Sequence, residues 1–290
     1  MFTPVRTEDG SNTFYSDEFD EWFHSRAGAY NEAQKTYVEA SNIAGRARQN
    51  SLSILDVCYG LGYNTAAALE TIWGVNPQCF VNLRALEIDV EVARSAIAQN
   101  LTQNYSPLAQ VLEDLAAHYS AKRATLYAQL VLGDARQQIQ TLVNQAWQAD
   151  TIFLDPFSPP HCPQLWTLEF LTLVAQCLDP NDGVLVTYSC AAAVRSALQS
   201  IGLTIRSTDA GSRKWPGTIA SFSPAALPLS SRQLSKQEQE HLQTKAAVPY
   251  RDPSLTSTAS EILARRTQQQ LDSDLIPTGP WRKRWAAFKQ

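Results

Sequence analysis

The chain has 290 residues, 44% of them hydrophobic, and a formal net charge of −4. This length allows a sizeable core, in one large domain or one domain with an appendage. No apolar run approaches the roughly 20 residues of a membrane-spanning helix, and the N-terminus has no apolar signal-peptide region. The five cysteines are scattered and form no CxxC pair, which argues against a disulfide framework or a metal site and predicts a soluble cytoplasmic protein.

The charge is distributed unevenly. Residues 1–205 carry 11 Lys and Arg against 21 Asp and Glu, a net of −10, whereas residues 206–290 carry 13 against 7, a net of +6. An acidic body with a basic C-terminal part is typical of proteins that bind a polyanion such as nucleic acid. An ordinary solvated tail is the equally weighted alternative.

Residues 1–45 are predicted to form a structured extension with many aromatic side chains. Ser16 is a suitable N-cap for a helix over residues 17–25, and another helix is expected near Asn31. The extension fits either a lid over a ligand crevice, with His24 facing the ligand, or ordinary packing with a structural His24.

The clearest pattern in the chain is a strand, a glycine turn and a helix. The apolar residues 52–58 predict a buried parallel strand, Tyr59-Gly60-Leu61-Gly62 a turn, and Asn64 the start of a helix. Glycines allow the backbone to approach a ligand closely, and the N-terminus of a helix attracts anionic groups. The turn therefore predicts a nucleotide-like ligand, although a tight turn without a ligand stays open.

Acidic residues follow the next two strands. The strand predicted over residues 80–88 contains Glu87 near its end, where an acidic side chain accepts hydrogen bonds from ribose hydroxyls. Asp89 is expected to cap the following helix. After the strand over residues 129–133, Asp134 is either a helix N-cap or an acceptor at the crevice, and both roles can hold at once.

The fourth predicted strand, residues 150–155, runs into a proline-rich loop that begins Pro156-Phe157. Asp155 then lies at the carboxyl end of a strand, where open α/β sheets hold their ligands. A fifth strand over residues 183–189 and a closing pair over 203–207 and 217–222 complete an α/β fold with a doubly wound, mostly parallel sheet.

From Pro224 onward the pattern changes to polar amphipathic helices over residues 230–247 and 254–271. We expect an N-terminal extension (1–45), a nucleotide-binding domain (46–224) and a basic helical appendage (225–290). Near the end of the chain, two tryptophans flank Arg282, Lys283 and Arg284, a combination that can bind phosphate and stack on bases. Docking of a terminal helix by the tryptophans is the alternative.

The motifs favour S-adenosylmethionine over a nicotinamide cofactor. The third glycine of GxGxxG is absent, since Thr65 stands at its position. The Asp-Pro-Phe sequence at 155–157 matches the acidic, proline, aromatic motif of amino-group methyltransferases. In such enzymes the carboxylate holds the amine and the aromatic side chain packs on the target, so Asp155 and Phe157 are the predicted catalytic residues, Asp155 both as clamp and as proton acceptor.

In these motifs the sequence resembles the methyltransferase part of the MnmC-type enzymes of tRNA wobble-uridine modification, in a stand-alone form without the oxidase domain. The resemblance rests on TEDGS (7–11), FHSRAGAYNEA (23–33), CYGLGYN (58–64), LEID (86–89), GDAR (133–136), FLDPFSPPHCPQLW (153–166) and SRKWPGTIAS (212–221). It implies a Rossmann-like class I S-adenosylmethionine-dependent methyltransferase that converts aminomethyl-uridine in tRNA to methylaminomethyl-uridine. A hand-over of tRNA from the enzymes that install the aminomethyl group fits this role.

The resemblance also implies site residues. The cofactor-binding set is Tyr59, Gly60, Gly62 and Asn64 around the methionine portion, Glu87 at the ribose, and Asp134 with Ala135 at the adenine. Asp155 would hold the amine. Apart from the resemblance, we expect His24, Pro156, Arg213 and Lys214 to contact substrate or RNA, and the charge asymmetry predicts that Arg282, Lys283 and Arg284 of the basic C-terminal part contact RNA. No flavin is expected. Two alternatives stay open, a transferase of methyl or aminopropyl groups acting on a small amine or a protein, and a non-catalytic nucleotide- or RNA-binding module.

Overall fold

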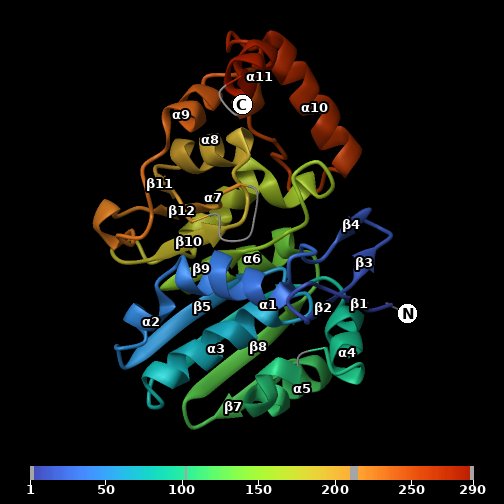
Figure 1. Ribbon diagram of the computed structural model, residues 1–290, viewed down its shortest axis with the longest axis vertical. Coiled ribbons are helices and arrows are strands. Elements are labelled where there is room, and N and C mark those ends of the chain that lie inside the picture. The colour runs from blue at the N-terminus through green and yellow to red at the C-terminus, as the bar shows by residue number, and fades with distance from the viewer. Residues whose placement is uncertain (1–2, 102, 210–214, 288–290) are drawn as a thin grey trace.

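The computed structural model describes residues 3–101, 103–209 and 215–287 and is built on one eight-stranded sheet (Figure 1). The strands follow one another across the sheet in the order β11-β12-β10-β9-β5-β6-β8-β7. Their bounds are β5 Ser51–Val57, β6 Phe80–Glu87, β7 Ser120–Arg123, β8 Leu126–Leu132, β9 Thr151–Leu154, β10 Val184–Thr187, β11 Thr204–Ser207 and β12 Thr218–Ser221. The five central strands are parallel, and β7 and β12 run antiparallel to their neighbours. The predicted α/β class is confirmed.

The register of the parallel strands aligns their carboxyl ends. Val57 of β5 pairs with Leu86 of β6 on one side and with Leu154 of β9 on the other. The residues that follow these three positions therefore emerge at one edge of the sheet, as expected for parallel strands. They include Glu87 and Asp155.

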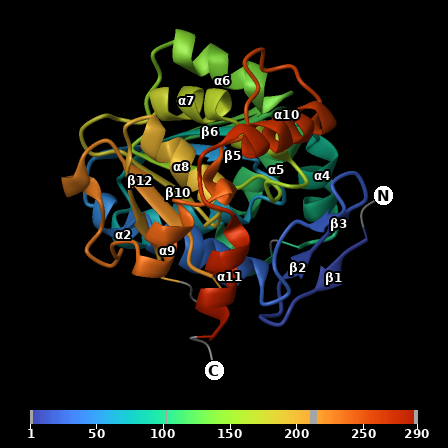
Figure 2. The same ribbon diagram turned by 90° about the horizontal axis from the view of Figure 1, so that it is seen from above.

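Two hydrophobic cores cover the two faces of the sheet. Along β5, Ile54 packs into one core and Leu55 into the other, which is the alternation of side chains that a strand imposes. The first core holds residues of α2, α3 and α5, and the second holds residues of α6, α7 and α8. Figure 2 shows α2 and α6 on opposite sides of the sheet.

The helices of this part are α1 Ala29–Glu32, α2 Ile43–Arg46, α3 Tyr63–Val75, α4 Val90–Ala98, α5 Ala109–His118, α6 Ala135–Asn144, α7 Leu168–Gln176 and α8 Ala192–Ser200, with the π-helix η1 Ala33–Glu39 and the 3-10 helices η2 Gln103–Leu108 and η3 Pro163–Trp166.

The N-terminal segment differs from its prediction. The helix expected over residues 17–25 is wrong, because the chain forms a short hairpin of β3 Tyr15–Ser16 and β4 Glu21–Trp22. The backbone of Asp20 is left-handed, with φ 50°, which breaks an α-helix and turns the chain back. A second pair, β1 Val5–Arg6 and β2 Asn12–Thr13, precedes it. The helix expected near Asn31 is confirmed by α1 and η1.

The segment after β12 packs on the helices that cover the second core (Figure 1). Its elements are η4 Pro224–Ala226, α9 Lys236–His241, η5 Lys245–Ala247, α10 Ala259–Asp272 and α11 Thr278–Ala287. Arg195 of α8 is buried and forms an ion pair with Glu238 of α9, with 2.9 Å between Nη1 and Oε1. The same guanidinium donates to Ser207 and Thr218 of the closing strands. Among the described helices, none is both long and apolar enough to cross a bilayer.

Glu238→Gln is expected to lower the free energy of unfolding by about 3 kcal/mol, because it leaves the Arg195 charge buried without a counter-ion. Urea denaturation would measure the change. Glu240→Gln is the matched control, because its partner Arg284 is about half exposed and such a pair contributes roughly 0–1 kcal/mol. An equal decrease in the free energy of unfolding in the two variants would contradict the role of Glu238 as counter-ion of the buried Arg195.

Candidate active site

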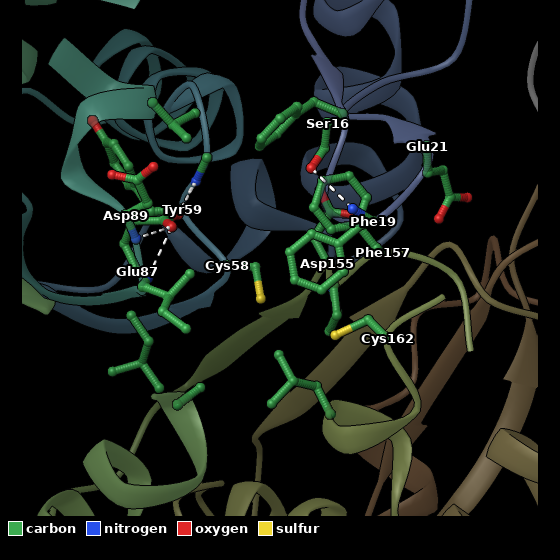
Figure 3. A pocket seen from close by; sticks show the side chains of 18 of the residues that line it. Ser16, Phe19, Glu21, Cys58, Tyr59, Glu87, Asp89, Asp155, Phe157 and Cys162 are labelled. Carbon is green, nitrogen blue, oxygen red and sulfur yellow. Dashed lines mark hydrogen bonds between the residues drawn. The ribbon is translucent and has the colours of Figure 1, made fainter. Parts of the chain in front are cut away.

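A cavity of about 460 Å³ opens at the carboxyl edge of the parallel strands. This volume lies within the usual range of ligand pockets. The lining comes from the β3–β4 hairpin, the glycine turn, and the segments that follow β6, β8 and β9. Figure 3 shows Glu87, Tyr59 and Asp89 on one side, Phe19, Phe157 and Cys162 on the other, and Cys58 between them. The structure thus brings the predicted Glu87, Asp134 and Asp155 to one cavity.

The glycine turn after β5 wraps the backbone around one end of the cavity. Cys58, Gly60 and Gly62 all have left-handed backbones, with φ of 71°, 57° and 87°. The two glycines adopt this conformation without strain. Tyr59, Gly60 and Asn64 line the cavity. Gly62 is not among the lining residues of the described chain. A Cβ there would lie 2.5 Å from the Tyr59 hydroxyl, so Gly62 makes room for that side chain.

Glu87 ties the end of β6 to the glycine turn. One carboxylate oxygen accepts the Gly60 N–H at 2.7 Å, and the other accepts the N–H groups of Ile88 and Asp89 at 2.8 and 2.9 Å. Burial raises the pKa of Glu87, and these backbone bonds oppose the rise. A carboxylate has about four acceptor sites, so one stays available to a ligand. Asp89 caps α4 as predicted, accepting the N–H of Glu91.

Asp134 is held by an arginine that the sequence did not single out. It caps α6 by accepting the Arg136 N–H, and the Arg136 guanidinium pairs with both of its carboxylate oxygens. The remaining guanidinium nitrogen, Nη1, donates to the buried Asp252 at 3.0 Å and to the Ser257 carbonyl at 2.9 Å. The segment before α10 is therefore connected to the cavity wall. Ala135 also lines the cavity.

Asp155 follows β9 and receives a hydrogen bond on each carboxylate oxygen. Asn64 Nδ2 donates to Oδ2 at 2.9 Å, and the Tyr37 hydroxyl donates to Oδ1. Burial and the nearby Glu32 raise the pKa of Asp155 well above its ordinary value, and the two hydrogen bonds oppose the rise. Tyr37 lies 118 residues from Asp155, so no local sequence pattern pointed to this contact.

The proline-rich loop is fixed by contacts with the β3–β4 hairpin. The Phe157 ring stacks on Phe19, with 4.6 Å between centroids, and meets Phe23 edge-on at 4.9 Å. Glu21 accepts the Ser158 N–H at 2.8 Å. The Pro156 carbonyl accepts the Tyr188 hydroxyl at 2.9 Å. The N-terminal extension therefore covers the loop that carries Asp155 and Phe157.

The predicted substrate contacts are only partly brought to the cavity. His24 lines it, and burial lowers the pKa of His24 to about 4, so the ring is neutral at pH 7. Arg213 and Lys214 lie outside the described residues. Arg282, Lys283 and Arg284 lie on α11, away from the cavity, and the indole N–H groups of the flanking Trp281 and Trp285 donate to α9. The tryptophans thus dock α11, which is the alternative role considered for them.

Carboxylates dominate the charge of the cavity. Seven line it, against two arginines: Glu18, Glu21, Glu32, Glu87, Asp89, Asp134 and Asp155, with Arg26 and Arg136. Arg136 is already paired with Asp134. The electrostatic potential of the other lining carboxylates therefore favours cationic ligands. In the part of the chain that the structure describes, no cluster of three or more histidine, cysteine or acidic side chains is arranged to hold a metal ion.

Comparisons with known proteins agree on the family. A family profile described as S-adenosyl-L-methionine-dependent methyltransferase matches residues 93–223. The crystal structure of MnmC2 from Aquifex aeolicus is similar, with a TM-score of 0.82 and 31% identity over 94% of this chain and 86% of that one. An uncharacterised protein of Methanocaldococcus jannaschii is 29% identical over 96% of this chain and 75% of its own. The tRNA 5-methylaminomethyl-2-thiouridine biosynthesis bifunctional protein MnmC of Delftia acidovorans is 27% identical over 89% of this chain, which spans only 40% of that protein.

Asp252→Asn is expected to weaken binding of S-adenosyl-L-methionine about tenfold, because the charge-assisted bond that orients Arg136, and through it Asp134, is lost. Isothermal titration calorimetry would measure the dissociation constant. Asp272→Asn serves as control, since the exposed Asp272 of α10 accepts from Gln268 and does not line the cavity. Unchanged affinity in the Asp252 variant would contradict the connection.

Proposed function

The chain belongs to the family of S-adenosyl-L-methionine-dependent methyltransferases that includes MnmC2, and on this premise we propose that it methylates the primary amine of an aminomethyl group on the wobble uridine of tRNA. The product would be methylaminomethyl-uridine. The name of the bifunctional MnmC relatives, which refers to 5-methylaminomethyl-2-thiouridine, supports this choice of substrate.

The residues of the cavity fit the methyl donor. S-adenosyl-L-methionine supplies, when bound, a methyl group on a positively charged sulfonium. The acidic lining suits that charge, and the N-terminus of the 13-residue helix α3 suits a carboxylate. In our proposal Tyr59, Gly60 and Asn64 hold the methionine portion, with Gly62 shaping the turn. Glu87 would accept from the ribose hydroxyls, and Asp134 with Ala135 would contact the adenine.

The observation that carries the proposal is the Asp155 carboxylate, placed beside Asn64 and next to Phe157 in the cavity wall. An alkylammonium acceptor must lose a proton before its nitrogen lone pair can form a bond. The pKa of Asp155 is raised, which brings it closer to the pKa of an alkylammonium group. Asp155 is therefore a better proton acceptor than an ordinary carboxylate. The N–C bond then forms as the S–C bond breaks, the bonding pair stays with sulfur, and Asp155 holds the proton.

Positioning accounts for much of the rate in such a transfer. Orientation of the reacting groups can contribute about 7–11 kcal/mol. Asn64 and Tyr37 orient Asp155, while the Phe19 stack fixes Phe157. Phe157 and Pro156 would pack against the uridine.

The basic C-terminal part would bind the tRNA backbone. Arg282 and Lys283 are exposed on α11, and the region from residue 206 has a net charge of +6. Arg284 is already paired with Glu240. Enzymes that install the aminomethyl group would supply the substrate tRNA. A reducing cytoplasmic setting belongs to the proposal, since no disulfide joins any of Cys58, Cys79, Cys162, Cys177 and Cys190 in the described structure.

A second candidate function is methyl transfer to a small cationic amine or to a lysine-like side chain of a protein. The seven carboxylates of the cavity favour it, because they attract any ammonium group and repel a phosphate backbone at the cavity mouth. This candidate needs no tRNA contact by α11. The two functions therefore differ in what the C-terminal cations do.

Asp155→Ala is expected to abolish methyl transfer, with a loss of about 10²–10⁴-fold from the proton-accepting role alone. The assay follows label from S-adenosyl-L-methionine into tRNA that bears aminomethyl-uridine. Asp182→Ala, in an exposed turn, is the control. Label in the wild type and its loss only in the Asp155 variant supports the proposal. Absence of label with wild-type protein, when the donor still binds, would reject tRNA as substrate.

Reversing the charges of Arg282 and Lys283 to Glu together is expected to lower tRNA affinity about tenfold or more and to reduce its salt dependence, because phosphate contacts release bound counter-ions. Filter binding at several salt concentrations would measure this. Lys122→Glu on β7, also an exposed cation, is the control. Equal affinities in all three proteins, with donor binding intact, would rule out a tRNA-binding role for α11.

A further inference from the structure

Tyr37 connects the N-terminal extension with the carboxylate at the centre of the site. It lies in η1, a π-helix of seven residues, and its side chain is completely buried. The ring packs edge-on against Phe153 of β9, with centroids 5.7 Å apart. π-Helical segments are rare and frequently occur at functional sites. This one places the phenol hydroxyl on Asp155, two residues after Phe153.

Tyr37 and Asn64 approach Asp155 from different elements. The phenol donates to Oδ1 from η1, and the amide donates to Oδ2 from the first turn of α3. Each carboxylate oxygen can accept two hydrogen bonds, so each retains an acceptor site. Two donors from separate elements fix the plane of the carboxylate. Tyr37 itself is not among the residues that line the cavity.

Several ionisable groups surround this carboxylate. Besides burial, Glu32 of α1 and Asp56 of β5 raise the pKa of Asp155, Asp155 in turn raises the pKa of Cys58 in the glycine turn, and Glu32 and Tyr188 raise the pKa of Tyr37. Burial and the two neighbouring carboxylates favour the protonated form of Asp155, whereas the bonds from Tyr37 and Asn64 favour the ionised form. Burial raises the pKa of Tyr37 far above its ordinary value, so the phenol stays protonated and remains a donor.

We propose that Tyr37 is a positioning residue that keeps Asp155 ionised and directs its remaining acceptor sites toward the substrate amine. The inference rests on the proposed role of Asp155 as proton acceptor. In this inference the N-terminal extension, which carries Tyr37, orients the proton acceptor in addition to covering the cavity.

The test is Tyr37→Phe, which removes one hydroxyl and keeps the ring. The acidic limb of the pH profile of kcat/KM, which follows ionisation of Asp155 in the free enzyme, is expected to move up by about one pH unit or more. At neutral pH the variant should lose about 10- to 100-fold in kcat/KM for the methyl acceptor, and the loss should shrink as the pH rises. The KM for S-adenosyl-L-methionine should stay unchanged, because Tyr37 does not line the cavity.

Tyr105→Phe is the matched control. Tyr105 is also fully buried, but it lies in η2 and its hydroxyl makes no contact with Asp155 in the described structure. A general loss of packing or stability would affect both variants, whereas the pH shift should appear only in Tyr37→Phe. Identical pH profiles for the wild type and Tyr37→Phe would overturn the inference.

A spectroscopic measurement separates this inference from the substrate assignment. If the wild-type protein transfers no methyl group to aminomethyl-uridine tRNA, the proposed function fails, and difference infrared spectroscopy still reports on Asp155. The carboxylic-acid band that disappears in Asp155→Asn identifies this residue. A higher midpoint for its titration in Tyr37→Phe than in the wild type would support the positioning role. An unchanged midpoint would overturn it.

Discussion

The arrangement of the site depends on one constraint, that the carboxyl group of Asp155 is largely removed from water and must find its hydrogen-bond partners inside the protein. Transfer of Asp155 out of water favours its neutral form. The protein compensates with hydrogen-bond donors, one from η1 and one from α3. Because both donors must arrive at the end of β9, the N-terminal extension has to pack against α3 and the sheet. The position of the extension is thus linked to a carboxyl group that lies 118 residues after Tyr37 in the chain.

The glycine turn, Glu87 and Asp134 form the other half of the cavity, and their arrangement follows from the sheet. Parallel strands in register deliver their last residues to one edge, so local sequence was sufficient to predict this half. Apolar strands, glycines after β5 and acidic residues after β6 and β8 are each visible in a short stretch of sequence. The helix caps at Asp89 and Asp134 were also predictable, since a capping side chain bonds to a residue two positions away.

The remaining features depend on contacts between distant segments, for which one sequence gives no local signal. Ser16 was expected to cap a helix over residues 17–25, but this segment forms the β3–β4 hairpin, and Phe19 in its turn stacks on Phe157. Tertiary packing overrode helix propensity there. Tyr37 and Asp155 are 118 residues apart, and Arg136 and Asp252 are 116 apart. Such pairs become evident only when the fold brings them together.

The contact of Arg136 with both Asp134 and Asp252 has a consequence for the C-terminal segment. Coupling free energies are reciprocal. If the contact with Asp252 strengthens ligand binding by a certain free energy, then bound ligand stabilises the segment that carries Asp252 by the same amount. Arg266 of α10 bonds to the Val248 carbonyl and lies over the Tyr250 ring, 4.3 Å from its centroid, so this stability extends to α10. The adenosine moiety is common to the methyl donor and its demethylated product. If Asp134 contacts adenine as proposed, the C-terminal segment responds to occupancy of the cavity and not to the presence of the methyl group.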